Sequence, residues 1–265
     1  MLKSRIVELS FLLLIATSLW SQNAPMVSIK RGAYVPLYGT TDKKPVEIAA
    51  FEMDVYPVTN AQFVTFLKKY PAYTRSKMKG IFADKSYLSH WQSDYDYGKN
   101  NLSTAPVTNV SWFAAKKYCE CQGKRLPTMD EWEYVAMADE KRIDARTKEA
   151  FNKYIMFWYE KPKTYNNPIG KTFKNYWGVY DMHGLVWEWT SDFNSIFLSG
   201  ESRKDTDTDK NLFCGSGAVN ATDLMNYAAF MRYAFRASLK AHYTSKNLGF
   251  RCATDNGIQL KSTKN

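Results

Sequence analysis

The segment from Gly178 to Asp192 reads Gly-Val-Tyr-Asp-Met-His-Gly-Leu-Val-Trp-Glu-Trp-Thr-Ser-Asp and combines aromatic side chains with acids. Two of its carboxylates, on Asp181 and Glu188, lie close in sequence to backbone carbonyl groups that could join them around one cation. Calcium binds such oxygen ligands, about six to eight of them. The spacing therefore predicts a calcium site formed by the side chains of Asp181 and Glu188 and the carbonyl oxygens of Gly184 and Val186. The alternative is that both carboxylates accept hydrogen bonds from backbone donors in a tight turn.

The four cysteines, Cys119, Cys121, Cys214 and Cys252, are the other residues with chemistry of their own. Four cysteines allow three full pairings, and spacing alone does not choose among them. Cys119 and Cys121 lack the Cys-x2-Cys spacing of zinc sites, and the three histidines of the chain are far apart. A zinc site is therefore disfavoured.

Residues 1–21 have the pattern of a secretory signal peptide. Two basic residues precede an apolar run from Leu9 to Leu19, and Ser21 offers a small residue before a cleavage point. The run is shorter than the roughly 20 residues of a membrane span. We therefore expect an exported protein, periplasmic or secreted, that is not an integral membrane protein after cleavage. The acid Glu8 within this region leaves an uncleaved N-terminal anchor as the alternative.

The remaining chain is expected to form one domain. No internal repeat or low-complexity linker interrupts it, and turn signals are spread evenly, which favours a single domain over residues 26–256 followed by a basic tail over 257–265. The formal net charge of +10 comes from lysines that are scattered rather than gathered in one block. A basic surface is therefore favoured over nucleic-acid binding.

Three helices are predicted by their N-terminal capping residues. Thr59 with Gln62 three residues later is a capping-box pattern, and apolar residues follow at helical spacing. Ser111 caps a second helix that extends to about Gln122. Thr128 caps a third, again with an acid three residues later.

The strands are expected to be short and the rest of the chain irregular. Residues 26–36 and 48–56 read as strands, residues 70–105 as a long loop, and the chain after residue 150 as loops, turns and short strands. This composition of elements predicts an α+β fold with few helices and much irregular chain.

Several segments resemble the formylglycine-generating enzyme family, also called sulfatase-modifying factors. In order along the chain, they are Pro57-Val-Thr-Asn-Ala-Gln-Phe63, Pro106-Val-Thr-Asn-Val-Ser-Trp112, Gly123-Lys-Arg-Leu-Pro-Thr-Met-Asp-Glu-Trp-Glu-Tyr134, the Gly178–Asp192 segment and Asn247-Leu-Gly-Phe-Arg-Cys252. The resemblance implies a variant of the C-type-lectin-like fold. It also implies calcium at Asp181, Gly184, Val186 and Glu188.

The resemblance further implies a disulfide between Cys119 and Cys252, which an oxidising compartment would preserve. The chain departs from the family at the copper site, so copper is not expected. Oxidases of the family bind copper(I) through two cysteines, and thiolates suit this soft ion. This chain has no cysteine between Cys214 and Cys252. The best-matched positions carry Ala228 and either Asn220 or Asp223, depending on where a short gap falls.

The function implied is that of an exported binding or assembly factor that keeps the fold and lacks the copper oxidase activity, so no catalytic residue is assigned. The alternative is an oxidase of the same family with an altered metal site that acts on a protein cysteine. The expected partner is an unidentified protein or glycan. Aromatic residues between 85 and 112 would either line a groove for it or cover a helix pair: Tyr87, Trp91, Tyr95, Tyr97 and Trp112.

Overall fold

The computed structural model describes residues 24–37, 44–193 and 224–255. The predicted signal peptide, the basic tail and Cys214 lie outside these ranges. Within them the largest sheet has three antiparallel strands in the order β1 (Met26–Ile29), β4 (Phe51–Asp54) and β7 (Ala253–Asp255). The C-terminal strand therefore pairs with a strand formed two hundred residues earlier, through the register Met53 to Ala253.

Two smaller pairs of strands complete the described β structure. The strands β2 (Gly32–Tyr34) and β3 (Val46–Ile48) are antiparallel. The strands β5 (Trp187–Glu188) and β6 (Leu248–Gly249) are parallel. Because β5 lies within the Gly178–Asp192 segment and β6 lies within the Asn247–Cys252 segment, this pair brings two of the family motifs together.

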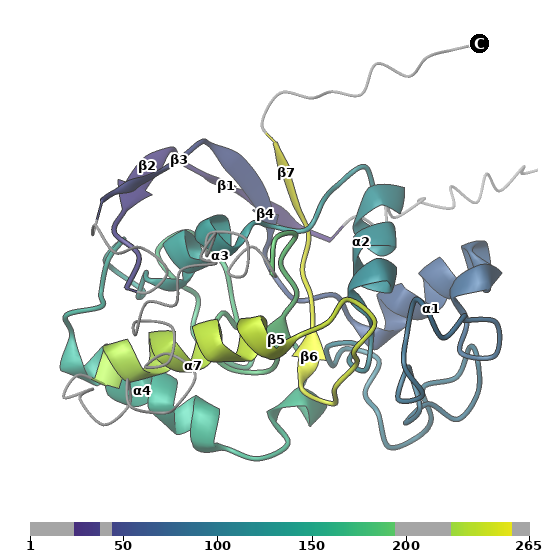
Figure 1. Ribbon diagram of the computed structural model, residues 1–265. Coiled ribbons are helices and arrows are strands. Elements are labelled where there is room, and N and C mark those ends of the chain that lie inside the picture. Colours follow the sequence, from purple (N-terminus) through teal and green to yellow (C-terminus); the bar gives the residue numbers. More distant parts are fainter. Residues whose placement is uncertain (1–23, 38–43, 194–223, 256–265) are drawn as a thin grey trace, which may run out of the picture.

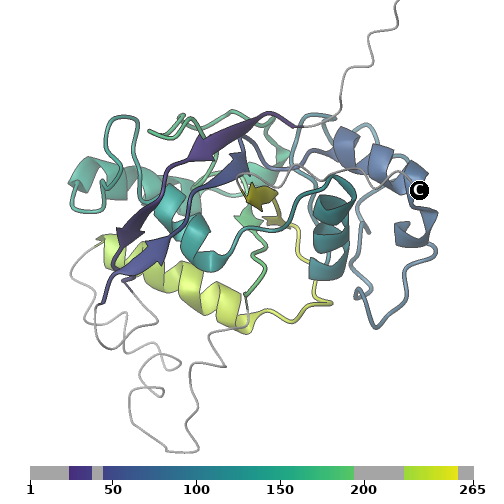
Figure 2. The same ribbon diagram turned by 90° about the horizontal axis from the view of Figure 1, so that it is seen from above.

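The helices lie on one side of the sheet and at its two ends (Figures 1 and 2). The helix α3 (Met129–Ala136) lies beneath the sheet, and α4 (Glu149–Glu160) packs against α7 (Leu224–Ser238) at one end. At the opposite end are α1 (Asn60–Lys69) and α2 (Trp112–Cys121). Two 3-10 turns, Pro71–Tyr73 and Thr164–Asn166, complete the described helical structure. The α+β class with short strands and much irregular chain is confirmed.

All three predicted helix starts are confirmed. Thr59 accepts a hydrogen bond from the Gln62 backbone N–H, and the Gln62 side chain accepts one from the Thr59 backbone N–H. Thr128 and Glu131 form the same reciprocal pair, and Ser111 caps α2 by accepting from the Ala114 backbone N–H. Such caps satisfy backbone donors that the first helical turn leaves unpaired.

Two expectations about the elements are wrong. The chain after residue 150 is not only loop and short strand, because it contains most of α4 and all of α7. The helix α4 lacks the local start signal, since Lys148 at its N-cap makes no side-chain cap hydrogen bond. The two expected strands are also interrupted. The range 26–36 contains two separate strands, β1 and β2, and the range 48–56 contains the last residue of β3 and then β4.

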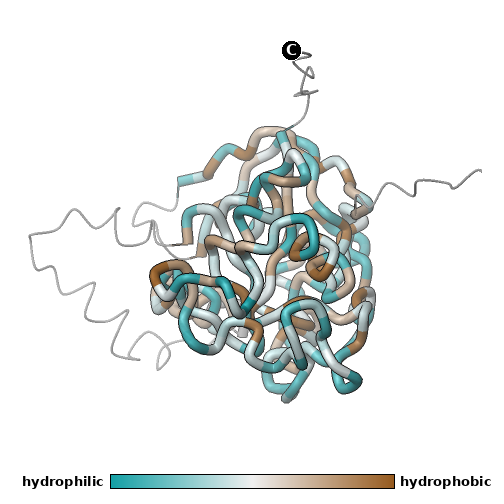
Figure 3. The backbone as a smooth tube through the Cα atoms, turned by 90° about the vertical axis from the view of Figure 1, so that its right-hand side faces the viewer, coloured by the Kyte–Doolittle hydropathy of each residue, from teal (hydrophilic) through white to brown (hydrophobic). Residues whose placement is uncertain are grey.

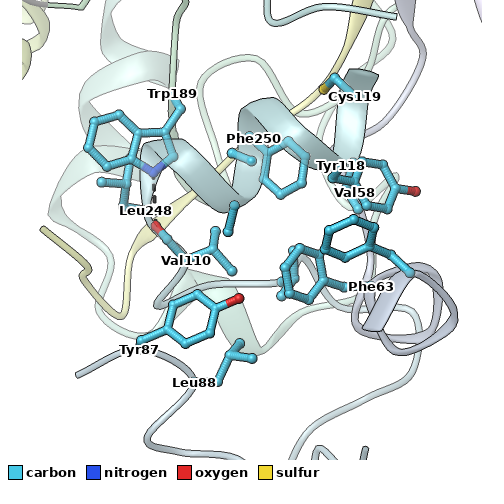
Figure 4. Close-up of a cluster of buried hydrophobic side chains, with 14 of the residues drawn as sticks. Val58, Phe63, Tyr87, Leu88, Val110, Tyr118, Cys119, Trp189, Leu248 and Phe250 are labelled. Carbon is cyan, nitrogen blue, oxygen red and sulfur yellow. Dashed lines mark hydrogen bonds between the residues drawn. The ribbon is translucent and has the colours of Figure 1, made fainter. Parts of the chain in front are cut away.

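The largest apolar core lies between α1, α2 and the two paired motif segments (Figure 4). Phe63 stacks on Tyr118 with ring centroids 6.0 Å apart, and Phe250 meets both rings edge-on. The completely buried indole of Trp189 donates a hydrogen bond of 2.9 Å to the Val110 carbonyl oxygen. Tyr87 and Trp91 also belong to this core, so these two aromatics of the 85–112 segment pack inward.

Apolar stretches along the backbone are short and alternate with hydrophilic ones (Figure 3). Within the ranges that the structure describes, no helix is both long and apolar enough to cross a membrane.

Candidate functional site

The Gly178–Asp192 segment contains a turn around Asp181–Gly184 followed by β5. Asp181 has a φ of 63°, in the left-handed region that aspartate tolerates better than most side chains. Gly184 follows, and a Cβ there would lie 2.2 Å from Cγ2 of Thr172, so the tight turn requires glycine at this position. The turn places Asp181, His183 and Glu188 among buried side chains.

Glu188 forms a fully buried ion pair with Arg251. Its Oε2 accepts hydrogen bonds of 2.8 Å from Arg251 Nε and from the indole Nε1 of Trp132, and its Oε1 accepts one of 2.8 Å from Arg251 Nη2. The guanidinium also donates to the backbone carbonyls of Asp54, Val55 and Tyr180. All donors of Arg251 therefore have partners, and the carboxylate of Glu188 is neutralised by a protein cation.

Asp181 is held by backbone donors. Its Oδ2 accepts a hydrogen bond from the Gly170 N–H at 2.5 Å, and its Oδ1 accepts one from the Thr172 N–H at 2.9 Å. The Thr172 hydroxyl accepts a third from the Asp181 N–H. Burial raises the pKa of Asp181 above its ordinary value, although these backbone hydrogen bonds and the nearby Arg251 oppose the shift. For Asp181, these contacts are the backbone hydrogen bonds in a tight turn that were the alternative to calcium.

The four predicted calcium residues do not form an open oxygen cage. Both oxygens of the buried Asp181 carboxylate accept backbone hydrogen bonds, and both oxygens of Glu188 accept hydrogen bonds from Arg251. Within the described ranges, no group of three or more His, Cys, Asp or Glu side chains is placed to share a metal ion. As they lie, these residues do not fit the ion, and calcium stays a prediction.

A second buried charge cluster joins α3 to α7. Glu133 accepts hydrogen bonds from Arg232, at 2.7–3.1 Å, and from Arg236 at 2.6 Å. Burial alone would raise the pKa of Glu133, but attraction to the two guanidinium groups outweighs it and lowers the pKa to about 2. Both arginines also lie over the ring of Trp132, Arg236 at 4.7 Å from its centroid. Two cations therefore share one carboxylate.

A cavity of about 200 Å³ opens between these two clusters. Arg236 and Glu188 lie in its wall, together with His183, whose Nε2 is 2.6 Å from the Ala136 carbonyl oxygen. Burial lowers the pKa of His183 to about 3, and the charge of Arg232 contributes further, so this imidazole is neutral at pH 7. Much of the remaining wall is aromatic: Trp132, Trp158, Tyr159, Trp187 and Phe235. Its aromatic wall and the cations Lys161, Lys163 and Arg236 suit a small group that combines apolar surface with negative charge.

The position matched to one copper-binding cysteine is a buried alanine. Ala228 is fully buried on α7, in the cluster with Phe151 and Ile155 of α4. Asn220 and Asp223, the candidates for the other position, lie outside the described residues. At the position that the resemblance matches to a copper-binding cysteine, the structure therefore has a methyl group in helix packing.

The structure contains the disulfide that the resemblance implied, between Cys119 of α2 and Cys252. It ties α2 to the residue that precedes β7. Cys121 is free and partly exposed.

Sequence reasoning missed the basic partners of this region. Arg251 lies within a motif segment, but its pairing with Glu188, 63 residues earlier, has no local signal. Arg232 and Arg236 lie one helical turn apart on a segment expected to be loop or short strand. Recognising that segment as a helix would have placed both arginines on one face.

Comparison with known proteins agrees with the motifs. The sulfatase-modifying factor enzyme 1-like domain matches residues 15–256. The chain is 27% identical over 260 residues to mouse formylglycine-generating enzyme, covering 82% of this chain and 69% of the relative. It is 28% identical over 255 residues to the bovine protein named inactive C-alpha-formylglycine-generating enzyme 2, covering 81% and 80%.

Among solved structures, PvdO from Pseudomonas aeruginosa is similar over 89% of this chain and 95% of its own, with a TM-score of 0.49 and 17% identity. The match to the domain extends over most of the chain and contains both paired motif segments. The chain belongs to the sulfatase-modifying factor enzyme 1-like family.

Proposed function

We propose that this protein is an exported binding or assembly factor that keeps the family fold without copper-dependent oxidation. The observation that carries the proposal is Ala228, a buried methyl group at a position where the oxidases need a thiolate. No other cysteine follows Cys214 before Cys252, so the pair is missing in the sequence as well. Thiolates stabilise copper(I), and a methyl group offers no lone pair. The similarity to relatives named inactive supports the same conclusion.

A binding role is supported by the cavity beside Glu188 and Arg236. It is lined by aromatic side chains and by cations, including Lys161 and Lys163 at its edge. Such a lining provides both contact area and charge recognition for a protein or glycan partner. The alternative, an oxidase with an altered metal site, is separated from this proposal by an activity measurement.

Aerobic incubation with copper and a Cys-x-Pro-x-Arg peptide should leave the peptide cysteine unchanged. A formylglycine-generating enzyme with its cysteine pair intact serves as the positive control, and mass spectrometry of the peptide is the measurement. A matched variant, Asp223→Cys with Ala228→Cys, tests whether thiolates alone restore copper binding. Conversion by the parent protein at a rate comparable with the control would overturn the proposal in favour of the altered oxidase.

Export to the periplasm or the medium is a further part of the proposal. The pattern of residues 1–21 supports it, and so does the Cys119–Cys252 disulfide, because disulfides persist in oxidising compartments. Mass spectrometry of the protein recovered outside the cytoplasm should find a new N-terminus near residue 22. Recovery of the full-length chain from the cytoplasm alone, with Cys119 reduced, would contradict export.

A further inference from the structure

Another concave surface, formed by entirely different residues, includes residues of α2. The helix α2 lies at the opposite end of the molecule from α4 (Figures 1 and 2). The surface is a groove of about 370 Å³ between α2 and the segment 72–82. We call it the α2 groove. Its lining residues are Ala72, Tyr73, Lys77, Met78, Lys79, Phe82, Trp112, Phe113, Lys116, Lys117 and Glu120. None of them lines the cavity beside Glu188.

Three of the residues that line the α2 groove form a row of aromatic rings. Phe82 meets Phe113 edge-on with centroids 5.2 Å apart, and Phe113 meets Trp112 in the same way at 5.5 Å. Phe82 is 41% exposed, and its neighbour Ile81 is 72% exposed. Contiguous apolar surface of this kind marks interaction sites, because a partner that covers it removes apolar surface from water, which favours binding.

The rim of the α2 groove is strongly basic. Four lysines and one glutamate line it, which gives four positive charges minus one negative charge, a net +3. The only rim carboxylate, on Glu120, lies 3.8 Å from both Lys116 and Lys117. These two ion pairs are long and exposed to solvent, and pairs of this kind contribute little free energy. Lys116 also lies over the Trp112 ring, 5.0 Å from its centroid. The rim therefore carries positive charge that the lining residues leave largely unneutralised.

The hydrogen-bonding groups of the lining favour a peptide over a sugar. Lysine ammonium groups only donate, and besides them the lining offers the Tyr73 hydroxyl and the Glu120 carboxylate. A sugar hydroxyl group both donates and accepts, so a sugar site needs donors and acceptors close together. A carboxylate only accepts hydrogen bonds, so a lining rich in lysine donors suits it better. We propose that the α2 groove binds an acidic peptide segment of a partner protein. An apolar side chain of the segment rests against Phe82, Phe113 and Trp112, and its carboxylates meet the lysines.

This proposal goes beyond the proposed function and does not depend on it. The groove lies outside the cavity beside Glu188, so an active oxidase could carry it as well. The peptide-binding measurement and the formylglycine measurement therefore fail independently of each other.

The test uses the full-length protein and a fluorescein-labelled probe peptide, Asp-Glu-Phe-Asp-Glu-Leu-Asp, followed by fluorescence anisotropy. The parent should bind the probe, and the affinity should fall as salt is raised from 50 to 500 mM, since exposed charges are screened. The variant Lys79→Glu with Lys116→Glu should weaken binding about tenfold or more, because it replaces two attractions by repulsions. The variant Phe82→Ala should weaken it by a similar factor through the lost anchor contact.

Matched controls lie on other surfaces. The variant Lys171→Glu with Lys174→Glu makes the same change of net charge at two exposed lysines outside the groove, and Phe157→Ala removes a 55% exposed ring on α4. Both controls should bind the probe as the parent does. Equal losses in the groove variants and the controls would show nonspecific charge attraction and overturn the proposal. So would absence of binding by the parent, or a heparin fragment that binds while the peptide does not.

Discussion

Replacing Arg251 with alanine should lower the free energy of unfolding by about 3–5 kcal/mol, because it leaves the Glu188 carboxylate buried without a cation. Both side chains of this pair are completely buried, and the carboxylate would retain only the indole N–H of Trp132. Urea unfolding followed by tryptophan fluorescence measures the change. The control is Lys153→Ala, which breaks a 2.6 Å pair with Glu149 whose side chains are 66% and 76% exposed. That variant should change stability by about 0.5 kcal/mol or less.

A double variant separates burial of an unpaired charge from loss of packing. Arg251→Met with Glu188→Gln removes both charges and should be more stable than Arg251→Ala, because no ion is left unpaired. A loss of less than about 1 kcal/mol in Arg251→Ala would mean that the carboxylate takes a proton or another cation.

The predicted calcium site is tested by a separate measurement. The thermal midpoint of the parent is measured with calcium and with a chelator, and again in Asp181→Ala with Glu188→Ala. A midpoint that rises with calcium in the parent and not in the double variant would support the calcium prediction. A parent that shows no calcium dependence would refute it.

Removing the Cys119–Cys252 disulfide should cost about 4–5 kcal/mol in the chain-entropy model, since the bridge closes a loop with a sequence separation of 133 residues. For a domain of this size each 1 kcal/mol corresponds to roughly 2–4 °C in the melting temperature. The variant Cys119→Ser with Cys252→Ser, compared with the parent under oxidising conditions, should therefore melt well below it.

Two comparisons make the disulfide result specific. Cys121→Ser changes a free cysteine on the same helix and should melt within about a degree or two of the parent. Reductant should lower the melting temperature of the parent and leave the double serine variant unchanged. Equal melting temperatures for the parent and the double variant would show that the bridge does not form.

Local signals in the sequence were sufficient for three helices. The side chains of Thr59, Ser111 and Thr128 bond the first turns of their own helices, so the information lies within a few residues. The helix α4 lacks such a cap at Lys148 and was therefore missed. Its stability comes from packing against α7, a contact between segments far apart in the chain.

The sequence motif singled out two acids of the candidate site but not their contacts. The motif predicted Asp181 and Glu188 as calcium ligands, which stays a prediction, and the structure buries both side chains. Their partners could not be predicted, because Glu188 pairs with a residue 63 positions away and Asp181 is held by two backbone N–H groups of another turn. The α2 groove was also missed. Of the aromatics expected to line a groove, only Trp112 does so, beside Phe82 and Phe113.

The late position of residues 248–255 has a consequence for the timing of folding. Until these residues have been synthesised, β4 has only one of its two neighbouring strands, Glu188 lacks Arg251 and Cys119 lacks its disulfide partner Cys252. A nascent chain that lacks them cannot complete its sheet, its buried charge pair or its covalent bridge. The three-stranded sheet, the buried ion pair and the disulfide are therefore all completed only after residues 248–255 have left the ribosome.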